Sequence, residues 1–361
     1  MRGLEITLSD SKTRSILEAA LDGIPPSRED LEYLARMRNI ETTLAMFKVA
    51  RRICELNFGK KVFLYGFVYF STYCRNVCTF CRYNRTNLNT QRYRKSLEEV
   101  LEAVEILEKS GVHLVDLTMG EDPKIRAEHY KPLIEMCREI KYNFNLPIMV
   151  SPGVVPREVL SQFKKIGVEW YALYQETYNR SLFSKLRPRQ SFDERLYAKI
   201  LARRDGLLIE DGILMGVGET DKDIIDSIIS MKEIGAEQVR IMSFQPASEI
   251  PLKAAPISLL DELRAIAMMR FVHQDKLIPA SYDIDGIKGL ELRLMAGANV
   301  ITSLLPPGTG FVGVAQPELG INDRTRTVEG IRPYVERLGL EVATRKQYVR
   351  YIEKRLLEQR E

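Results

Sequence analysis

The chain has 361 residues, of which 53 are basic, 49 are acidic and 45% are hydrophobic, with a formal net charge of +4. This length exceeds one ordinary domain of about 150 residues but suits a single α/β barrel with extensions. The small net charge indicates no nucleic-acid-binding surface. Only three histidines are present, which argues against a multi-histidine zinc or haem enzyme and leaves cysteine as the informative metal ligand.

The cysteines are odd in number and unevenly spaced, at Cys54, Cys74, Cys78, Cys81 and Cys137. A secreted disulfide scaffold would use an even and denser set, so the pattern predicts reduced thiols and a cytoplasmic protein. The N-terminal segment lacks the apolar stretch of about 7–15 residues that a signal peptide needs. The longest apolar run, residues 62–70, is about half a membrane span, so we expect no membrane segment.

In chain order, residues 1–60 predict a helical extension, with a helix-start signal at Ser27 and apolar residues at helical spacing. Beyond it, short apolar runs alternate with amphipathic helices. The runs that predict buried parallel strands lie near 62–70, 113–119, 146–151, 168–174, 208–216, 238–244, 277–283 and 299–305.

Eight strand–helix units in series predict an α/β fold, a (βα)8 TIM-type barrel with extra N-terminal and C-terminal helices. We assign residues 1–60 to the N-terminal extension, 61–311 to the barrel and 312–361 to a C-terminal helical extension, all within one domain. A doubly wound open sheet is the alternative. It would usually carry a glycine-rich phosphate loop after its first strand, where this chain has cysteines.

Three of the cysteines, Cys74, Cys78 and Cys81, follow the first strand directly. Thiolates at this spacing can bind one 4Fe–4S cluster, and a set of three leaves one iron open to bind a substrate. The alternative is a zinc site or a group of buried thiols. A zinc ribbon normally has a second Cys-x-x-Cys or a histidine pair, which is absent here. Cys54 and Cys137 lie in predicted helices, where we expect them in the core.

Three charged residues interrupt strands that should be apolar: Asp116 in the second, Arg240 in the sixth and Asp283 in the seventh. A charge inside a barrel is costly unless it is paired. Arg240 and Asp283 could therefore pair with each other. Alternatively, Arg240 binds a carboxylate and the two acids bind ammonium groups, a pattern that suits a basic amino acid such as lysine or ornithine.

The motif Cys-x3-Cys-x-aromatic-Cys after the first barrel strand resembles that of the radical S-adenosylmethionine (SAM) superfamily. The resemblance implies that the open iron binds the amino and carboxylate groups of SAM, and that the reduced cluster cleaves SAM to a 5′-deoxyadenosyl radical. It also implies a set of SAM-binding residues at the barrel mouth: Phe80 against the adenine, Met119, Gly120 and Glu121 at the end of the second strand, Ser151 at the end of the third, and Glu176 and Arg187 beyond the fourth. Taken alone, Gly120 and Glu121 could belong to an ordinary turn, and Glu176 and Arg187 could be solvated loop charges.

Longer stretches resemble the methylornithine synthase family of pyrrolysine biosynthesis, over about residues 62–307. They are FxYFSTYCRNxCxFC, VDLTMGEDP, LPIMVSPGV, ALYQETY, IEDGILMGVG, LIPASYDIDGI and ELRLMAGANVITSLLPP. The resemblance implies isomerisation of L-lysine to (3R)-3-methyl-D-ornithine, through hydrogen abstraction, fragmentation and recombination, with an electron donor such as flavodoxin or ferredoxin.

For that family, Arg240 and Ser281 would bind the substrate carboxylate, and Asp283 and Asp116 the amines. Two alternatives stay open. One is a different radical SAM enzyme on the same barrel, a maturase or a sulfur-inserting synthase related to biotin synthase. The other is a non-enzymatic iron–sulfur redox protein.

Overall fold

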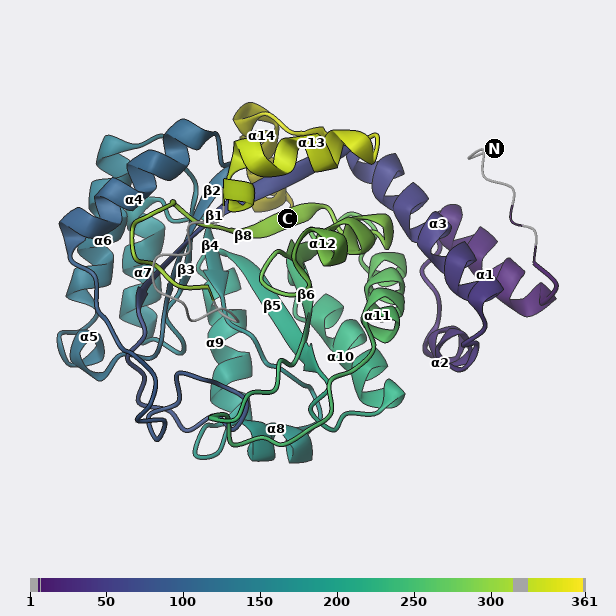
Figure 1. Cartoon of the computed structure of the whole chain (residues 1–361), viewed down its shortest axis with the longest axis horizontal. Coiled ribbons are helices and arrows are strands. Elements are labelled where there is room, and N and C mark those ends of the chain that lie inside the picture. The colour runs from purple at the N-terminus through teal and green to yellow at the C-terminus, as the bar shows by residue number, and fades with distance from the viewer. Residues whose placement is uncertain (1–5, 7, 314–323, 360–361) are drawn as a thin grey trace.

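The computed structural model describes residue 6, residues 8–313 and residues 324–359. Its centre is a barrel of eight parallel strands surrounded by helices (Figure 1). The strands are β1 (Lys61–Ser71), β2 (Leu114–Met119), β3 (Ile148–Ser151), β4 (Trp170–Ala172), β5 (Leu208–Met215), β6 (Gln238–Ser243), β7 (Pro279–Ser281) and β8 (Val300–Leu304). The predicted strand runs are all confirmed in position, although β4 and β7 are only three residues long.

The strands follow the order β6-β5-β4-β3-β2-β1-β8-β7, and every neighbouring pair is parallel. The two ends of this series meet at one parallel bridge, between Gln238 of β6 and Leu277 just before β7. The amide of Val239 donates to the Leu277 carbonyl at 3.0 Å, and the Leu277 amide donates to the Glu237 carbonyl at 3.1 Å. The barrel is thus closed where its strands begin. The prediction of a TIM-type barrel is confirmed.

The helices that cover the barrel begin and end at ordinary capping signals. For example, Ser96 and Glu99 form a reciprocal capping box at the start of α4, and Gly111 ends that helix with a φ of 96°. The helices between the strands are α4 (Leu97–Ser110), α5 (Pro123–Ala127), α6 (Lys131–Asn143), α7 (Arg157–Ile166), α8 (Arg180–Leu186), α9 (Phe192–Arg204), α10 (Asp221–Glu233), α11 (Leu259–Val272) and α12 (Gly286–Met295).

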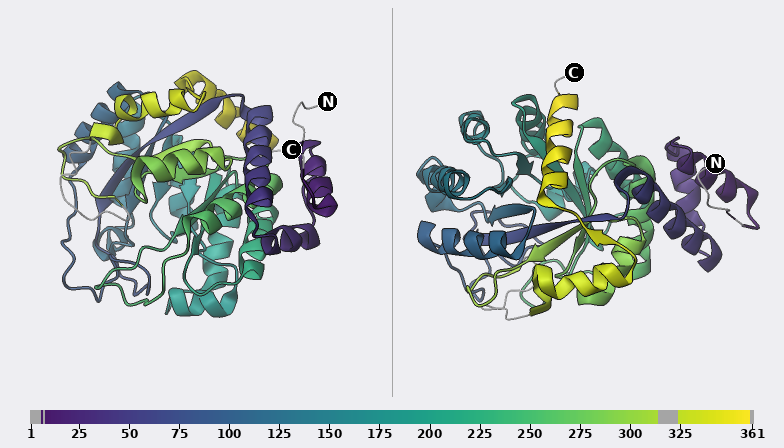
Figure 2. Two further views of the ribbon diagram at one scale, coloured as in Figure 1. Left: turned by 45° about the vertical axis from the view of Figure 1, so that its right-hand side comes forward. Right: turned by 90° about the horizontal axis from the view of Figure 1, so that it is seen from above.

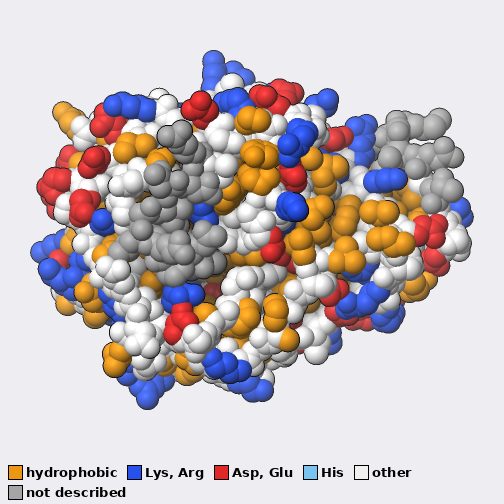
Figure 3. All heavy atoms as spheres, in the orientation of Figure 1, with side chains coloured by type: hydrophobic (Ala, Val, Ile, Leu, Met, Phe, Trp, Pro, Cys, Tyr) orange, Lys and Arg blue, Asp and Glu red, His pale blue; other side chains and the backbone are white. Residues whose placement is uncertain are grey.

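Three helices precede the barrel, as predicted for residues 1–60: α1 (Ser11–Leu21), α2 (Arg28–Arg36) and α3 (Ile40–Phe58). They lie to one side of the barrel (Figure 2), where α3 packs against α11 and α12, and α2 packs against α10. The buried guanidinium of Arg264, on α11, donates to the Thr43 hydroxyl at 2.6 Å and to the Leu34 carbonyl at 2.8 Å. Such contacts join the extension to the barrel as one body. Charges of both signs are interspersed over the face shown in Figure 3.

The C-terminal segment contains a 3-10 helix, η1 (Arg324–Arg326), followed by α13 (Val328–Arg337), β9 (Glu341–Val342) and α14 (Arg345–Glu358). Part of the predicted extension, residues 314–323, lies outside the described residues. The short strand β9 was not predicted, and it pairs in parallel with the start of β1.

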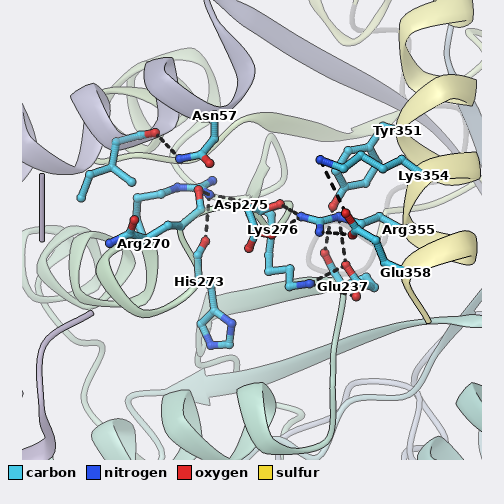
Figure 4. A network of polar contacts seen from close by, with 12 residues as sticks. Asn57, Glu237, Arg270, His273, Asp275, Lys276, Tyr351, Lys354, Arg355 and Glu358 are labelled. Atoms are coloured by element: carbon cyan, nitrogen blue, oxygen red, sulfur yellow. Dashed lines mark hydrogen bonds and ion pairs between the residues drawn. The ribbon is translucent and has the colours of Figure 1, made fainter. Parts of the chain in front are cut away.

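Helix α14 lies against the end of the barrel where the strands begin. Its Tyr348 is fully buried, with its hydroxyl 2.6 Å from that of Tyr65 on β1. Its Arg355 forms ion pairs with Asp275 at 2.6 Å and with Glu237 at 3.3 Å (Figure 4). This helix therefore covers the barrel end opposite the catalytic loops. No helix in the described part of the chain is long and apolar enough to cross a membrane.

Candidate active site

The loop that carries Cys74, Cys78 and Cys81 is fastened to the residues that follow β2. The Gly120 amide, after β2, donates to the Ser71 carbonyl at 2.8 Å, and the Arg75 amide donates to the Glu121 carbonyl at 3.0 Å. A Cβ at position 120 would lie 2.3 Å from the Tyr73 carbonyl oxygen, closer than any side chain can approach. Only glycine therefore allows β2 and the cysteine loop to pack in this way.

The three thiols of this loop lie near one another and are largely removed from water. Cys78 is buried, while Cys74 and Cys81 are half-buried. Burial raises the pKa of Cys81 well above its usual value, and the charges of Cys78 and Cys74 raise it further. Gln190 and Arg187 donate to the Cys78 sulfur, at 3.0 and 3.6 Å.

These donors fit the group that the loop was predicted to hold. Among the described residues, no three His, Cys, Asp or Glu side chains gather tightly enough to hold a single metal ion. A 4Fe–4S cluster needs no such convergence, because each of the three cysteines would bind a different iron and the fourth iron would stay open. Soft thiol donors on one short loop are the ligands that such a cluster requires.

Beside the cysteines, three of the predicted SAM-binding residues come together. Arg187 forms a buried ion pair with Glu176. The Arg187 guanidinium also lies over the Phe80 ring, 5.2 Å from its centroid. Burial lowers the pKa of Arg187, but the charges of Cys78 and Glu176 outweigh this effect and hold it above its usual value. The Arg187 Nε is buried and has no hydrogen-bond partner within the described residues, which leaves a donor for an incoming anion.

The remaining predicted SAM-binding residues lie at the same edge of the barrel. Ser151 stands beside Thr118 in the β2–β3 register, and Met119 is buried at the end of β2. The Glu121 carboxylate accepts from Arg75 Nε at 3.1 Å and lies 3.7 Å from Arg195 Nη1. These residues come from separate loops, and the parallel strands bring their carboxyl ends to one rim.

Inside the barrel, Arg240 of β6 is held on two sides. Its Nη2 donates to the Thr302 hydroxyl of β8 at 2.8 Å, and its Nη1 donates to the Tyr174 hydroxyl at 3.1 Å. Its Nη1 also forms an ion pair with Glu210 of β5, 3.8 Å from Oε1. The Arg240 Nε is buried and without a hydrogen-bond partner in the described structure.

Asp116 of β2 shares this interior. Burial, and secondarily the charge of Glu210, raise its pKa from 3.8 to about 7. A hydrogen bond from Thr118 at 2.9 Å and the charge of Arg240 act in the opposite direction. Asp116 is therefore poised to be protonated or ionised near neutral pH.

Asp283 was predicted to bind an ammonium group of the substrate, and in the structure its carboxylate forms an ion pair with Arg326. Its Oδ1 lies 2.5 Å from Nη1 of Arg326, and both side chains are almost completely buried. Ser281 accepts a hydrogen bond from the Asp283 amide at 3.2 Å. The alternative prediction, an ion pair between Arg240 and Asp283, is wrong: Arg240 pairs with Glu210, and Asp283 pairs with Arg326.

Further residues of the site were not among those predicted: Tyr174, Arg195, Glu210, Thr302 and Arg326. Glu210, like Arg240, is a charged residue within a strand that should be apolar. The same criterion could therefore have identified it from the sequence. Tyr174 and Thr302 are uncharged and have no such signal. Arg326 lies 43 residues beyond Asp283, and no sequence pattern links the two.

The comparisons with known proteins agree with this site. Residues 68–229 match the family model described as the Radical SAM superfamily. The chain is 40% identical to the 3-methylornithine synthase of Methanosarcina acetivorans over 332 residues, which covers 92% of this chain and 94% of that protein. The chain belongs to the 3-methylornithine synthase family. It is thus a radical SAM enzyme, as its cysteine motif predicts.

A crystal structure of methylornithine synthase matches this family member with a TM-score of 0.88 and 38% identity, over 93% of this chain and 99% of that one. The FeFe hydrogenase maturase subunit HydE of Thermotoga maritima is 32% identical, over 80% of this chain and 82% of that protein. The weaker match to a maturase does not favour the alternative of another radical SAM activity. The predicted family and barrel are both confirmed.

Proposed function

We propose that this protein isomerises L-lysine to (3R)-3-methyl-D-ornithine in pyrrolysine biosynthesis. The observation that carries the proposal is the set of charges inside the barrel, where the acids Asp116, Glu210 and Asp283 outnumber the guanidinium groups of Arg240 and Arg326 by one. This is the complement of a molecule with one carboxylate and two ammonium groups. The similarity to 3-methylornithine synthases over nearly the whole chain supports the same substrate.

The cofactors of the proposal are a 4Fe–4S cluster on Cys74, Cys78 and Cys81, and SAM. When bound, they supply the 5′-deoxyadenosyl radical that abstracts hydrogen from the substrate. Arg187 offers its unpartnered Nε to the SAM carboxylate, while Glu176 and the end of β2 accept from its ribose and amino groups. The Phe80 ring supports the adenine.

In the barrel, the protein side chains bind both ends of the substrate. Arg240, with its free Nε, and Ser281 bind the carboxylate. Asp116 and Asp283 bind the two amines, and at Asp283 the ammonium shares the carboxylate with Arg326. A reaction that breaks and remakes a carbon skeleton needs such a grip, because the fragments must stay aligned between the steps. We also propose a cytoplasmic location, which the absence of a disulfide among the five cysteines supports, and a flavodoxin or ferredoxin as electron donor.

The test is to incubate the anaerobically reconstituted protein with lysine, SAM and a reductant, and to analyse the amino acids by mass spectrometry after derivatisation. We expect a product of the mass of lysine that elutes separately from it. Arg240→Ala should abolish this product and leave the cluster absorbance unchanged, whereas Arg337→Ala, on the surface of α13, should behave as wild type. Cleavage of SAM with lysine unchanged would instead indicate a different radical SAM enzyme. Turnover of lysine by Arg240→Ala would refute the carboxylate assignment.

A further inference from the structure

Glu210 is a buried acid at the centre of the barrel for which the proposed reaction has no role. Its residue is 1% exposed, on a strand whose described side chains are otherwise mostly apolar. The Tyr174 hydroxyl donates to Glu210 Oε1 at 2.8 Å and in turn accepts from Arg240 Nη1 at 3.1 Å. A direct ion pair of 3.8 Å joins Glu210 to the same guanidinium. Glu210, Tyr174 and Arg240 thus form one connected array.

This array orients Arg240. A guanidinium has five N–H donors in a rigid plane, and two neighbouring groups are enough to fix that plane. Here Tyr174 and Thr302 hold the two terminal nitrogens, which leaves Nε as a buried donor without a hydrogen-bond partner in the described structure. Because Glu210 anchors the Tyr174 hydroxyl, it controls the orientation of Arg240 without needing to touch a ligand.

The same carboxylate acts on Asp116 across the barrel. The charged and titratable groups that act on Asp116 are Glu210 of β5 and Arg240 of β6, with Tyr174 after β4. Its neighbours in the strand register, Phe67 of β1 and Met149 of β3, carry no charge. Two carboxylates and one guanidinium leave a net negative charge that a buried site can lose by binding a proton or by binding a cation.

We propose that Glu210 is the positioning residue of this site: it fixes Arg240 through Tyr174, and its charge makes Asp116 exchange a bound proton for an ammonium group of the entering substrate. The inference rests on the proposed function, because that function supplies an ammonium-bearing substrate. The exchange involves one proton only. It leaves Asp116 for solvent when the substrate cation arrives, so the ammonium group replaces the proton as the positive charge beside Asp116.

The first experiment measures the protons released when lysine binds, by isothermal titration calorimetry of the reconstituted protein in buffers of different ionisation enthalpy. Wild type should release close to one proton per lysine at pH 6, where Asp116 is protonated, and almost none at pH 8.5. The affinity for lysine should fall about tenfold per pH unit below pH 7. Binding at pH 6 without proton release would overturn the proposal.

Two variants separate the two roles of Glu210. Glu210→Gln keeps an acceptor for Tyr174 but removes the charge, so Asp116 should ionise at lower pH. Proton release at pH 6 should then decrease, and the acid loss of affinity should move to lower pH, while the burial of Asp116 is unchanged. Tyr174→Phe keeps the charge but breaks the link to Arg240, so affinity should fall at every pH while proton release at pH 6 remains. A purely structural role would instead give both variants the same pH-independent loss of affinity.

Two controls keep the inference separate from the choice of substrate. Glu341→Gln, on the exposed strand β9, should leave proton release unchanged. In the protein without lysine, the carboxyl infrared band of Asp116, assigned by its loss in Asp116→Asn, should titrate near neutral pH and shift to lower pH in Glu210→Gln. If this shift occurs but lysine does not bind, the proposed substrate is wrong and the role of Glu210 stands. If the band does not shift, the role of Glu210 is wrong whatever the substrate.

Discussion

Single buried charges decide what this barrel can bind. Asp116, Arg240 and Asp283 stand out in the sequence because each interrupts an apolar strand, and the structure buries Asp283 and partly buries the other two. Their partners, however, come from other strands and from the C-terminal segment. The residue types therefore indicate the kind of ligand, while the state of each charge depends on neighbours that are distant in sequence.

Gly120→Ala is expected to prevent assembly of the cluster. The added Cβ would lie 2.3 Å from the Tyr73 carbonyl oxygen and 3.0 Å from Cys74 Cβ, so the cysteine loop would have to move. We expect at least a tenfold fall in iron bound after reconstitution, measured together with the cluster absorbance. Gly212→Ala is the matched control, because its Cβ would meet Tyr174 and Arg240 instead and should leave iron content unchanged. Full iron content in Gly120→Ala would contradict this account of the loop.

Asp116→Asn is expected to stabilise the protein at high pH. Because the pKa of Asp116 rises from 3.8 to about 7 on folding, the folded state binds the extra proton between these values. Stability therefore falls as the pH rises from about 4 to 7, and the full cost remains above pH 7. The variant removes a cost of about 2–4 kcal/mol at pH 8 and nothing at pH 4. Urea unfolding at the two pH values measures the difference, and an equal effect at both would contradict the assignment.

At the scale of elements, helix α14 has the sequence of a solvent-exposed helix but packs one face against the barrel. Its alternation of charged and aromatic residues is typical of an amphipathic helix, and three of its side chains, Tyr348, Ile352 and Arg355, are buried against the start of the barrel. Figure 4 shows Arg355 reaching past Tyr351 to Glu237 and Asp275 on the loops that precede β6 and β7. These ion pairs tie the helix to the one place where the barrel closes.

Arg355→Ala is expected to destabilise the protein by about 3 kcal/mol, because it leaves the buried carboxylate of Glu237 with one cation fewer. Lys354→Ala, the neighbouring residue with a largely exposed side chain, is the control and should change stability by less than about 0.5 kcal/mol. Thermal unfolding of both variants measures the difference. Equal stability of the two would show that α14 is held by its apolar face alone.

At the scale of the whole molecule, β6 and β7 are the neighbouring strands that are joined least, and we call the line between them the seam of the barrel. Beyond the bridge at Gln238 and Leu277, no ladder of backbone hydrogen bonds joins the described residues of β6 and β7. The proposed ligands of the substrate lie on both sides of this seam, Arg240 on β6 and Ser281 on β7. A substrate bound to both would bridge the strands.

Lysine is therefore expected to slow amide hydrogen exchange in peptides that span residues 279–283. Without lysine these peptides should exchange faster than peptides of β1, which is paired on both sides by β2 and β8. With saturating lysine we expect at least a threefold slowing near β7 and no change in α7, on the far side of the barrel. Exchange near β7 that is insensitive to lysine would contradict a substrate that spans the seam.

Much of this protein follows from its sequence alone. The apolar runs locate the eight strands, because a buried parallel strand must be apolar on both faces, and the spacing of Cys74, Cys78 and Cys81 indicates the cluster, because three thiols on one loop can reach three irons. Tertiary structure alone decided that Arg326 pairs with Asp283 and that Glu210 and Tyr174 hold Arg240. These partners meet only when the barrel closes, since local pattern specifies the direction of a strand but not which side chains face each other across the interior.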